Sequence, residues 1–175
     1  MTVKRLNHAV LYVRDVERAV RFYEEALGFQ VAAQFPGAAF LQVPESRNDH
    51  DLGLFEVGAQ AGPSQAGRST VGLYHLAWEV ETLGELAEVA QRLSEMGALV
   101  GASDHGTTKA LYAKDPDGIE FEVSWLVPAE LIDDEVRAAK ATTKPLELQR
   151  EIERYGADRP GLRSVVYEGV TQAPR

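Results

Sequence analysis

Apolar residues alternate with polar ones or recur at helical spacing along most of the chain. Residues 6–13 alternate between two faces, one of which carries His8, and this period of two predicts a strand. Residues 16–27 repeat apolar positions at helical spacing between Asp15, which favours a helix start, and Gly28, which favours a helix end. Three more strands are predicted at residues 29–35, 38–43 and 50–57.

The same pattern begins again after residues 59–71, a stretch rich in Gly, Ala, Ser and Gln that predicts a linker. Residues 72–80 predict a strand, and Thr82 and Glu85 form a capping box at the start of a helix. Gly97 favours the end of that helix. Three further strands are predicted at residues 98–103, 109–113 and 119–125. The order strand-helix-strand-strand-strand thus occurs twice, which predicts two sibling βαβββ modules of the α+β class.

The chain beyond residue 127 has a different character. Residues 128–143 and 145–156 predict two charged helical segments, the second with Pro145 at its first position. Residues 158–175 predict an arm, a lid or a partly ordered tail. The domain plan that follows is a domain of residues 1–127, with modules at about 5–58 and 72–127, and a C-terminal helical extension of residues 128–175.

Composition narrows the classes of protein that this chain can be. With 175 residues, 45% hydrophobic and 26% charged, it has the make-up of an ordinary globular protein with a proper core. The net charge of −9 argues against binding to nucleic acid or to an anionic membrane surface. Because the chain has no cysteine, any metal must be held by His, Asp or Glu. We read no signal peptide and no membrane span, and we therefore expect a cytoplasmic protein.

Histidine and glutamate recur in register in the two modules. His8 and His75 occupy the same place in the first strand of each module, and Glu56 and Glu122 the same place in the last. A lone histidine in a strand is commonly a hydrogen-bonded structural residue, so the recurrence carries the prediction. Two imidazoles and one carboxylate form the triad that suits Fe(II) in oxygenases and leaves positions open for substrate and oxygen. We therefore expect His8, His75 and Glu122 to bind one metal ion.

Two other glutamates bear on this metal site. Glu120 shares the Glu122 face of its strand but lies nearer the tight turn of residues 115–118, so it is the reserve ligand. Glu56 is either a fourth ligand or a solvent-facing strand residue, and the sequence leaves both interpretations open.

The remaining histidines and one tyrosine form a second set of candidates. His50 shares a predicted strand face with Leu52 and Leu54, His105 lies in a loop, and Tyr112 lies in the strand before the tight turn. Histidine titrates near neutral pH and can move protons during turnover, and tyrosine can donate a hydrogen bond to an anionic oxygen. We expect these three residues to form an acid–base set. The structural alternatives are a surface strand end for His50, a loop cap for His105 and packing for Tyr112.

These features resemble the vicinal oxygen chelate superfamily, which includes glyoxalase I, the bleomycin and fosfomycin resistance proteins and type I extradiol dioxygenases. The resemblance covers about residues 6–125, and the motif DPDGxxxE at residues 115–122 is typical of the whole superfamily. Three segments resemble extradiol dioxygenases in particular. Residues 48–54 resemble the segment that carries their active-site base, residues 104–106 resemble the loop that holds a further active-site histidine, and residues 111–112 match their substrate-contacting tyrosine. The likeness is strongest to short catechol 2,3-dioxygenases with a single pair of modules.

The resemblance implies a partly open, metal-holding β-barrel and an Fe2+-dependent extradiol dioxygenase, with Mn2+, Ni2+ or Zn2+ as alternative metals. A small catechol-type aromatic diol and O2 would be the substrates. His50 would take a substrate proton, and His105 and Tyr112 would bind the substrate hydroxylate. Better-known members have four modules. Because a chain with two modules leaves a sheet edge and a helix surface to cover, we expect a homodimer.

Two rival functions remain open. A glyoxalase-type isomerase would use a carboxylate base and hold Ni(II) or Zn(II) with four ligands, His8, Glu56, His75 and Glu122. That chemistry needs no member of the acid–base set, so the set favours the dioxygenase. A metal-free protein that sequesters a drug-like ligand would tolerate the loss of any one metal ligand without losing binding.

Overall fold

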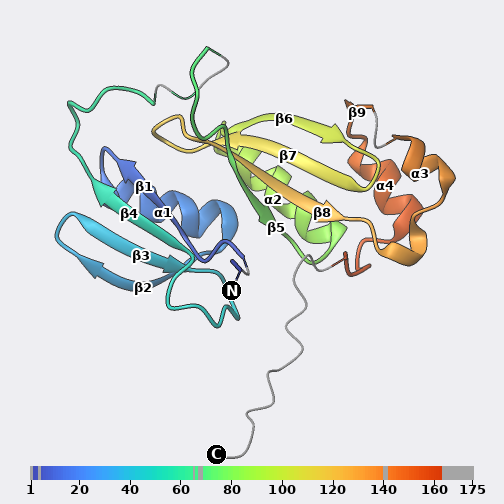
Figure 1. Cartoon of the computed structure of the whole chain (residues 1–175), viewed down its shortest axis with the longest axis horizontal. Helices are drawn as coiled ribbons and strands as arrows, with labels where there is room; N and C mark the ends of the chain where they lie inside the picture. Colours follow the sequence, from blue (N-terminus) through green and yellow to red (C-terminus); the bar gives the residue numbers. More distant parts are fainter. Residues whose placement is uncertain (1, 4, 65, 67–68, 140–141, 163–175) are drawn as a thin grey trace, which may run out of the picture. The chain divides into compact units, whose positions relative to one another are not determined.

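The structure is a computed structural model that describes residues 2–3, 5–64, 66, 69–139 and 142–162 (Figure 1). The first βαβββ repeat consists of β1 (Ala9–Val13), α1 (Val16–Leu27), β2 (Gln30–Phe35), β3 (Ala38–Gln42) and β4 (Leu52–Glu56). The second consists of β5 (Leu76–Glu79), α2 (Leu83–Glu95), β6 (Leu99–Asp104), β7 (Thr108–Lys114) and β8 (Glu120–Leu126). The predicted α+β class and the repeated element order are confirmed.

The strands form two open sheets. The first has the order β1-β4-β3-β2, in which β1 and β4 are parallel and the other neighbours are antiparallel. The second has the order β5-β8-β7-β6-β9, and its last strand, β9 (Lys144–Pro145), comes from the C-terminal extension. In the described part of the chain, the partly open barrel that the resemblance implies is therefore a pair of open sheets, and neither sheet closes on itself.

The chain divides into two compact units. The first unit contains the chain up to Leu76, Val89–Val100 and Ala113–Phe121. The second unit contains Ala77–Glu88, Gly101–Tyr112 and the chain from Glu122 onward. The second repeat is divided between the two units, so the units do not coincide with the predicted modules. The predicted module boundaries stay a prediction.

Both long helices begin and end where the sequence predicts. The Asp15 carboxylate accepts the Arg18 N–H at 2.8 Å at the start of α1, and Gly28 ends the helix in the left-handed conformation with φ 74°. At the start of α2 the Thr82 hydroxyl accepts the Glu85 N–H at 3.1 Å, and the Glu85 carboxylate accepts the Thr82 N–H at 3.0 Å. The predicted capping box is confirmed.

The strands that follow three of the histidines are shorter than the alternation predicts. β1, β4 and β5 begin at Ala9, Leu52 and Leu76, so His8, His50 and His75 each precede a strand instead of lying within it. Before β4, the Asp51 carboxylate accepts the Val43 N–H at 3.0 Å and the Ser46 hydroxyl at 3.0 Å. These side-chain hydrogen bonds organise a loop in place of a longer strand.

The first sheet buries one face and leaves the other exposed. α1 lies across the buried face (Figure 1), where the strands contribute apolar side chains, namely Leu11, Val13, Ala39, Leu41, Leu52 and Leu54. Because strand side chains alternate, Val10, Tyr12 and Phe55 lie on the opposite face, and all three are exposed. This exposed apolar face is a candidate for binding another molecule.

The Asp-Pro-Asp-Gly turn of residues 115–118 is bound to α1 within the first unit. The Tyr23 hydroxyl donates to the buried Asp115 carboxylate at 3.2 Å. Asp117 accepts the Arg14 N–H at 2.9 Å and forms ion pairs with the guanidinium groups of Arg14 at 3.0 Å and Arg18 at 2.7 Å. The motif therefore holds the β7–β8 turn by hydrogen bonds that the sequence alone did not indicate.

The buried Asp115 carboxylate predicts a pH-dependent stability. Burial raises the pKa of Asp115 above its ordinary value, although hydrogen bonds from the Ile119 and Asp117 N–H groups oppose the shift. Because the pKa of Asp115 is higher in the folded protein than in the unfolded chain, the protonated Asp115 carboxyl makes its full contribution to stability below the ordinary pKa of Asp. This contribution is lost as pH rises through the raised pKa. Asp115→Asn keeps an oxygen for these N–H groups but cannot ionise. We therefore expect its free energy of unfolding, relative to wild type, to increase between about pH 3 and pH 7.

Urea unfolding at a series of pH values measures this difference. Asp158→Asn, which removes an exposed carboxyl, is the control. A relative stability of Asp115→Asn that stays constant or falls with rising pH would contradict the prediction.

The C-terminal extension forms short elements beside the second sheet (Figure 1). They are a 3-10 turn (Ala129–Leu131), α3 (Asp134–Ala139), β9 and α4 (Leu148–Tyr155). Pro145 lies in β9 and α4 begins at Leu148, so the prediction that Pro145 starts the second helix is wrong. The physical reason is that Lys144 and Pro145 pair with β6. Residues 163–175 of the predicted tail lie outside the described residues, and no helix of the described chain has the length and apolar character that a membrane span requires.

Candidate functional site

His8 and His50 lie side by side on the exposed face of the first sheet. Their ring centroids are 4.5 Å apart, and the Phe40 ring is 4.9 Å from that of His50. His8 continues the alternation of Val10, and Val10 and Phe40 both pair with Gly53, so these side chains share the face opposite α1. His50 contacts this exposed face, whereas the sequence predicts that it shares a strand face with Leu52 and Leu54, which are buried here.

Asn48 joins the chain segments that carry the two histidines. Its side-chain amide donates to the backbone carbonyl of Asn7 at 2.6 Å and to that of His50 at 2.7 Å. Its side-chain oxygen accepts from the Asn7 amide at 2.9 Å. Asn48 therefore holds His8 next to His50. It is not among the candidates predicted from the sequence, although it belongs to the segment of residues 48–54 that resembles extradiol dioxygenases.

Hydrogen bonds at Nδ1 determine which nitrogen of each imidazole can act on a ligand. The Nδ1–H of His8 donates to the Asn7 side-chain oxygen at 2.7 Å, which leaves Nε2 as the nitrogen that could bind a metal. Nδ1 of His50 lies 2.8 Å from the Asp49 carboxylate. A proton held there leaves Nε2 of His50 as a basic nitrogen that can accept a proton.

A cluster of aromatic rings adjoins His50 through Phe40. The Phe40 ring centroid lies 6.4 Å from that of Phe35 and 5.8 Å from that of Phe55, both in edge-to-face geometry. Phe35 is 59% exposed and Phe55 is 37% exposed. Such rings favour contact with a planar aromatic molecule. The face can therefore bind an apolar ring beside the two imidazoles.

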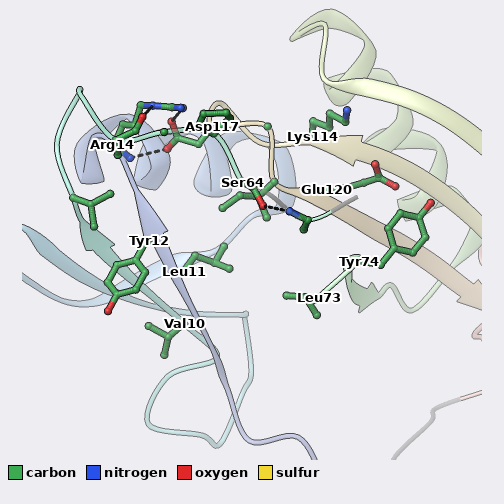
Figure 2. Close-up of a pocket in the computed structure, with 17 residues that line it drawn as sticks. Val10, Leu11, Tyr12, Arg14, Ser64, Leu73, Tyr74, Lys114, Asp117 and Glu120 are labelled. Atoms are coloured by element: carbon green, nitrogen blue, oxygen red, sulfur yellow. Dashed lines mark hydrogen bonds and ion pairs between the residues drawn. The ribbon is translucent and has the colours of Figure 1, made fainter. Parts of the chain in front are cut away.

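A cavity of about 680 Å³ lies in the first unit (Figure 2). Val10 and Tyr12, which share the His8 face of β1, line it together with Tyr74. Arg14 and Asp117, which form the ion pair at 3.0 Å, also line it. Its volume is that of a small-molecule site. The structure thus places space for a ligand next to the strand that follows His8.

His75 and Glu120 also belong to the first unit. The His75 ring is half-buried, and its centroid lies 4.6 Å from that of Tyr74. Glu120 begins β8 and lines the same cavity as Tyr74. Glu122 follows in the second unit, and because Phe121 and Val123 are buried, Glu120 and Glu122 project from the same, opposite face of β8. The predicted shared face of the two glutamates is confirmed.

His105 and Tyr112 form a hydrogen-bonded pair in the second unit. β6 ends directly before His105, and β7 carries Tyr112. The Tyr112 hydroxyl lies 2.9 Å from Nε2 of His105. The His105 N–H donates to the Thr108 carbonyl at 2.9 Å, which closes the turn between the two strands. Two of the three predicted acid–base residues are therefore in direct contact.

Glu56 makes a structural contact with α1. Its Oε2 accepts the N–H of Val16, the first residue of the helix, at 3.1 Å. Glu56 keeps the alternation of Leu54, which is buried against α1, so it lies on the face of the first sheet opposite His8. The structure does not bring Glu56 and His8 together.

The predicted metal ligands belong to different units, with His8 and His75 in the first and Glu122 in the second. Among the described residues, no group of three or more His, Asp or Glu side chains is placed to hold an ion. The donor chemistry nevertheless fits a divalent metal, because two imidazoles and a carboxylate are suitable ligands. His8 also has the Nδ1 hydrogen bond that commonly orients a metal-binding histidine. The ligand set His8, His75 and Glu122 stays a prediction.

The fold of the chain matches that of solved structures. A glyoxylase/bleomycin resistance protein/dioxygenase domain from Frankia sp. aligns with a TM-score of 0.59 and 23% identity, over 70% of this chain and 92% of that one. At this identity the match shows the fold alone. Residues 5–123 match the model of the Glyoxalase/Bleomycin resistance protein/Dioxygenase superfamily. The chain belongs to this superfamily.

Relatives within the superfamily include ring-cleaving dioxygenases. The chain is 35% identical over 118 residues to a catechol-2,3-dioxygenase of Bacillus subtilis, covering 67% of this chain and 40% of that protein. It is 31% identical over 147 residues to biphenyl-2,3-diol 1,2-dioxygenase 3 of Rhodococcus globerulus, covering 82% and 76%. It is also 26% identical over 136 residues to a lactoylglutathione lyase of Neisseria meningitidis serogroup A, covering 67% and 88%. The relatives differ in reaction, and the chain spans less than half of the Bacillus protein, so membership alone does not decide the activity.

Proposed function

We propose that this protein is an Fe2+-dependent extradiol dioxygenase, which cleaves a catechol-type aromatic diol with O2 beside the two hydroxyl groups. The observation that carries the proposal is the contact between His8 and His50, whose ring centroids lie 4.5 Å apart. A proposed metal ligand thus stands next to a proposed base. The two dioxygenase relatives, whose names state aromatic diols as substrates, support the choice.

His8, His75 and Glu122 would hold the ferrous ion. When bound, the metal supplies Lewis acidity for the diol oxygens and redox chemistry for O2. Nε2 is the nitrogen that His8 would offer, because its Nδ1 donates to Asn7. Mn2+, Ni2+ and Zn2+ are alternative ions for the same donors. Metal analysis after anaerobic purification tests the choice, since iron supports ring cleavage and nickel or zinc supports the isomerase.

His50 would remove a proton from the diol. Its Nε2 can accept a proton because Nδ1 lies 2.8 Å from the Asp49 carboxylate, which also stabilises the imidazolium that forms. The Asp49 side chain is 96% exposed, so water weakens this stabilisation. Phe40, 4.9 Å from His50 between ring centroids, would contact the ring of the substrate.

His105 and Tyr112 would bind the substrate hydroxylate as a pair. The hydrogen bond of 2.9 Å between the Tyr112 hydroxyl and Nε2 of His105 couples the two groups. A proton can move between this oxygen and this nitrogen while the tyrosine oxygen faces a substrate oxygen. The pair would therefore assist the later rearrangement by holding or releasing a proton.

Glu56 distinguishes the dioxygenase from the rival isomerase, for which the Neisseria lyase is the supporting relative. The isomerase uses Glu56 as a ligand, whereas here its carboxylate accepts the Val16 N–H. We expect Glu56→Ala to keep its metal and its turnover of catechol and to lose about 1 kcal/mol of stability, since one N–H at the helix start loses its partner. Metal content, catechol turnover and urea unfolding of the variant measure the three effects. Loss of the metal from Glu56→Ala would favour the isomerase.

We also propose that the protein is a homodimer. β2 is an edge strand of the first sheet and is mostly exposed, so it leaves a sheet edge that a second copy could cover. Sedimentation velocity of the purified chain tests this proposal, and a monomer at all accessible concentrations would contradict it.

A further inference from the structure

The C-terminal extension contacts the loop that carries His105. β9 pairs antiparallel with the end of β6, with Pro145 opposite Ser103 and Lys144 opposite Asp104. This pairing brings Thr143, the residue before β9, to the side of the imidazole that Tyr112 does not occupy. Its hydroxyl oxygen lies 3.3 Å from Nδ1 of His105. Both ring nitrogens of His105 therefore have a hydroxyl partner.

We propose that Thr143 is a positioning residue that sets the tautomer and the ring orientation of His105. A neutral imidazole has one donor nitrogen and one acceptor nitrogen. With the proton on Nδ1, the ring donates to the Thr143 oxygen, and Nε2 accepts the hydrogen of the Tyr112 hydroxyl. This tautomer leaves the lone pairs of the Tyr112 oxygen directed away from His105. The inference rests on the proposed function, because it assigns a partner to the proposed acid–base pair.

A second contact from the extension fixes the backbone of the same loop. Lys109 is 1% exposed, and its ammonium lies 2.6 Å from the Asp104 carboxylate and 2.9 Å from that of Glu151 in α4. The same Asp104 oxygen accepts the Gly106 N–H at 2.8 Å. The loop is thus attached to α4 through a buried ion pair. With the backbone held, the hydroxyl of Thr143 acts on the orientation of the His105 ring.

Nitrogen NMR of the imidazoles tests the proposal without using activity. The full chain carries four histidines, so its ring signals can be assigned with a His105→Gln variant. Diamagnetic Zn2+ is added in place of iron. In wild type we expect the His105 signals of the Nδ1–H tautomer. In Thr143→Val, which removes the hydroxyl with little change in shape, we expect a shift toward the Nε2–H tautomer, whereas Thr143→Ser should retain the wild-type signals.

Thr142→Val is the matched control. Its hydroxyl donates to the Ala139 carbonyl at 3.1 Å, so the variant removes a hydroxyl from the neighbouring residue without removing the contact with His105. We expect its His105 signals to equal those of wild type. His105 signals unchanged in Thr143→Val, or changed equally in Thr143→Ser, would overturn the proposal.

Kinetics of the iron-loaded variants provide the second measurement. Thr143→Val should lower kcat for catechol about tenfold with KM little changed, since one hydrogen bond that orients a proton-transfer group is lost. Thr143→Ser should restore the wild-type rate. If no variant and no wild-type protein cleaves a diol, the proposed function fails, but the NMR result still decides the role of Thr143. A wild-type kcat in Thr143→Val would overturn the proposal.

Discussion

Glu122→Ala should lose the metal and the ring cleavage together. The proposed site has three ligands, of which Glu122 is the one carboxylate. Its removal should weaken metal binding by more than about 100-fold, since even the loss of a group that only orients a ligand costs about 10–100-fold. Metal content after anaerobic purification and O2 uptake with catechol measure the two losses.

Glu120→Ala is the matched control for this variant. Glu120 lies two residues earlier on the same face of β8, so the variant removes an equivalent carboxyl from the same strand. We expect it to keep the metal. If Glu120→Ala loses the metal and Glu122→Ala keeps it, the ligand is Glu120 and the assignment to Glu122 is wrong.

His50→Ala should keep the metal and lose most of its turnover. His50 is the proposed base and not a ligand, so the ion should remain bound while kcat falls by about 100- to 10,000-fold, the usual contribution of a positioned proton-transfer group. Steady-state kinetics with metal-loaded protein measure the effect. The expected split, with metal content unchanged and kcat greatly reduced, distinguishes a base from a ligand.

Arg47→Ala is the control in the same loop, because Arg47 is exposed and close in sequence to His50. It should have wild-type turnover. A His50→Ala protein that cleaves catechol at the wild-type rate would remove His50 from the mechanism and leave the acid–base role to the pair of His105 and Tyr112.

The repeat and its helices could be predicted from the sequence because they depend on local signals. The capping box at Thr82 and the left-handed Gly28 act within a few residues of the helix ends that they define. The strand starts were less predictable. His50 fits the alternation of β4, but that strand begins only at Leu52, after Asp51 has accepted the Val43 N–H. The His50 ring lies beside His8, on the other face of the sheet.

Contacts between distant segments were beyond prediction. Tyr23 and Asp115 are 92 residues apart in sequence. Neither the helical spacing around Tyr23 nor the turn motif around Asp115 indicates that the tyrosine hydroxyl donates to this buried carboxylate. The contact of Thr143 with His105 could not be predicted for a similar reason. It precedes a strand of two residues, which is too short for any periodicity, yet the pairing of that strand with β6 places Thr143 beside His105.

The candidate site was predicted in part. The sequence grouped His105 with Tyr112, and the structure joins them at 2.9 Å. The sequence leaves open whether Glu56 is a ligand, because alternation alone does not say which face of a strand is buried. The contact of Glu56 with the Val16 N–H places it on the α1 face.

The central claim is that this protein opens the ring of a catechol with O2. The direct measurement is the absorbance of the reaction when anaerobically purified, Fe2+-loaded protein is mixed with catechol and air. We expect a yellow ring-opened product that absorbs in the near-visible, formed with one O2 consumed for each catechol. Iron-loaded protein that consumes no O2 and forms no such product, while it converts a hemithioacetal, would contradict the account.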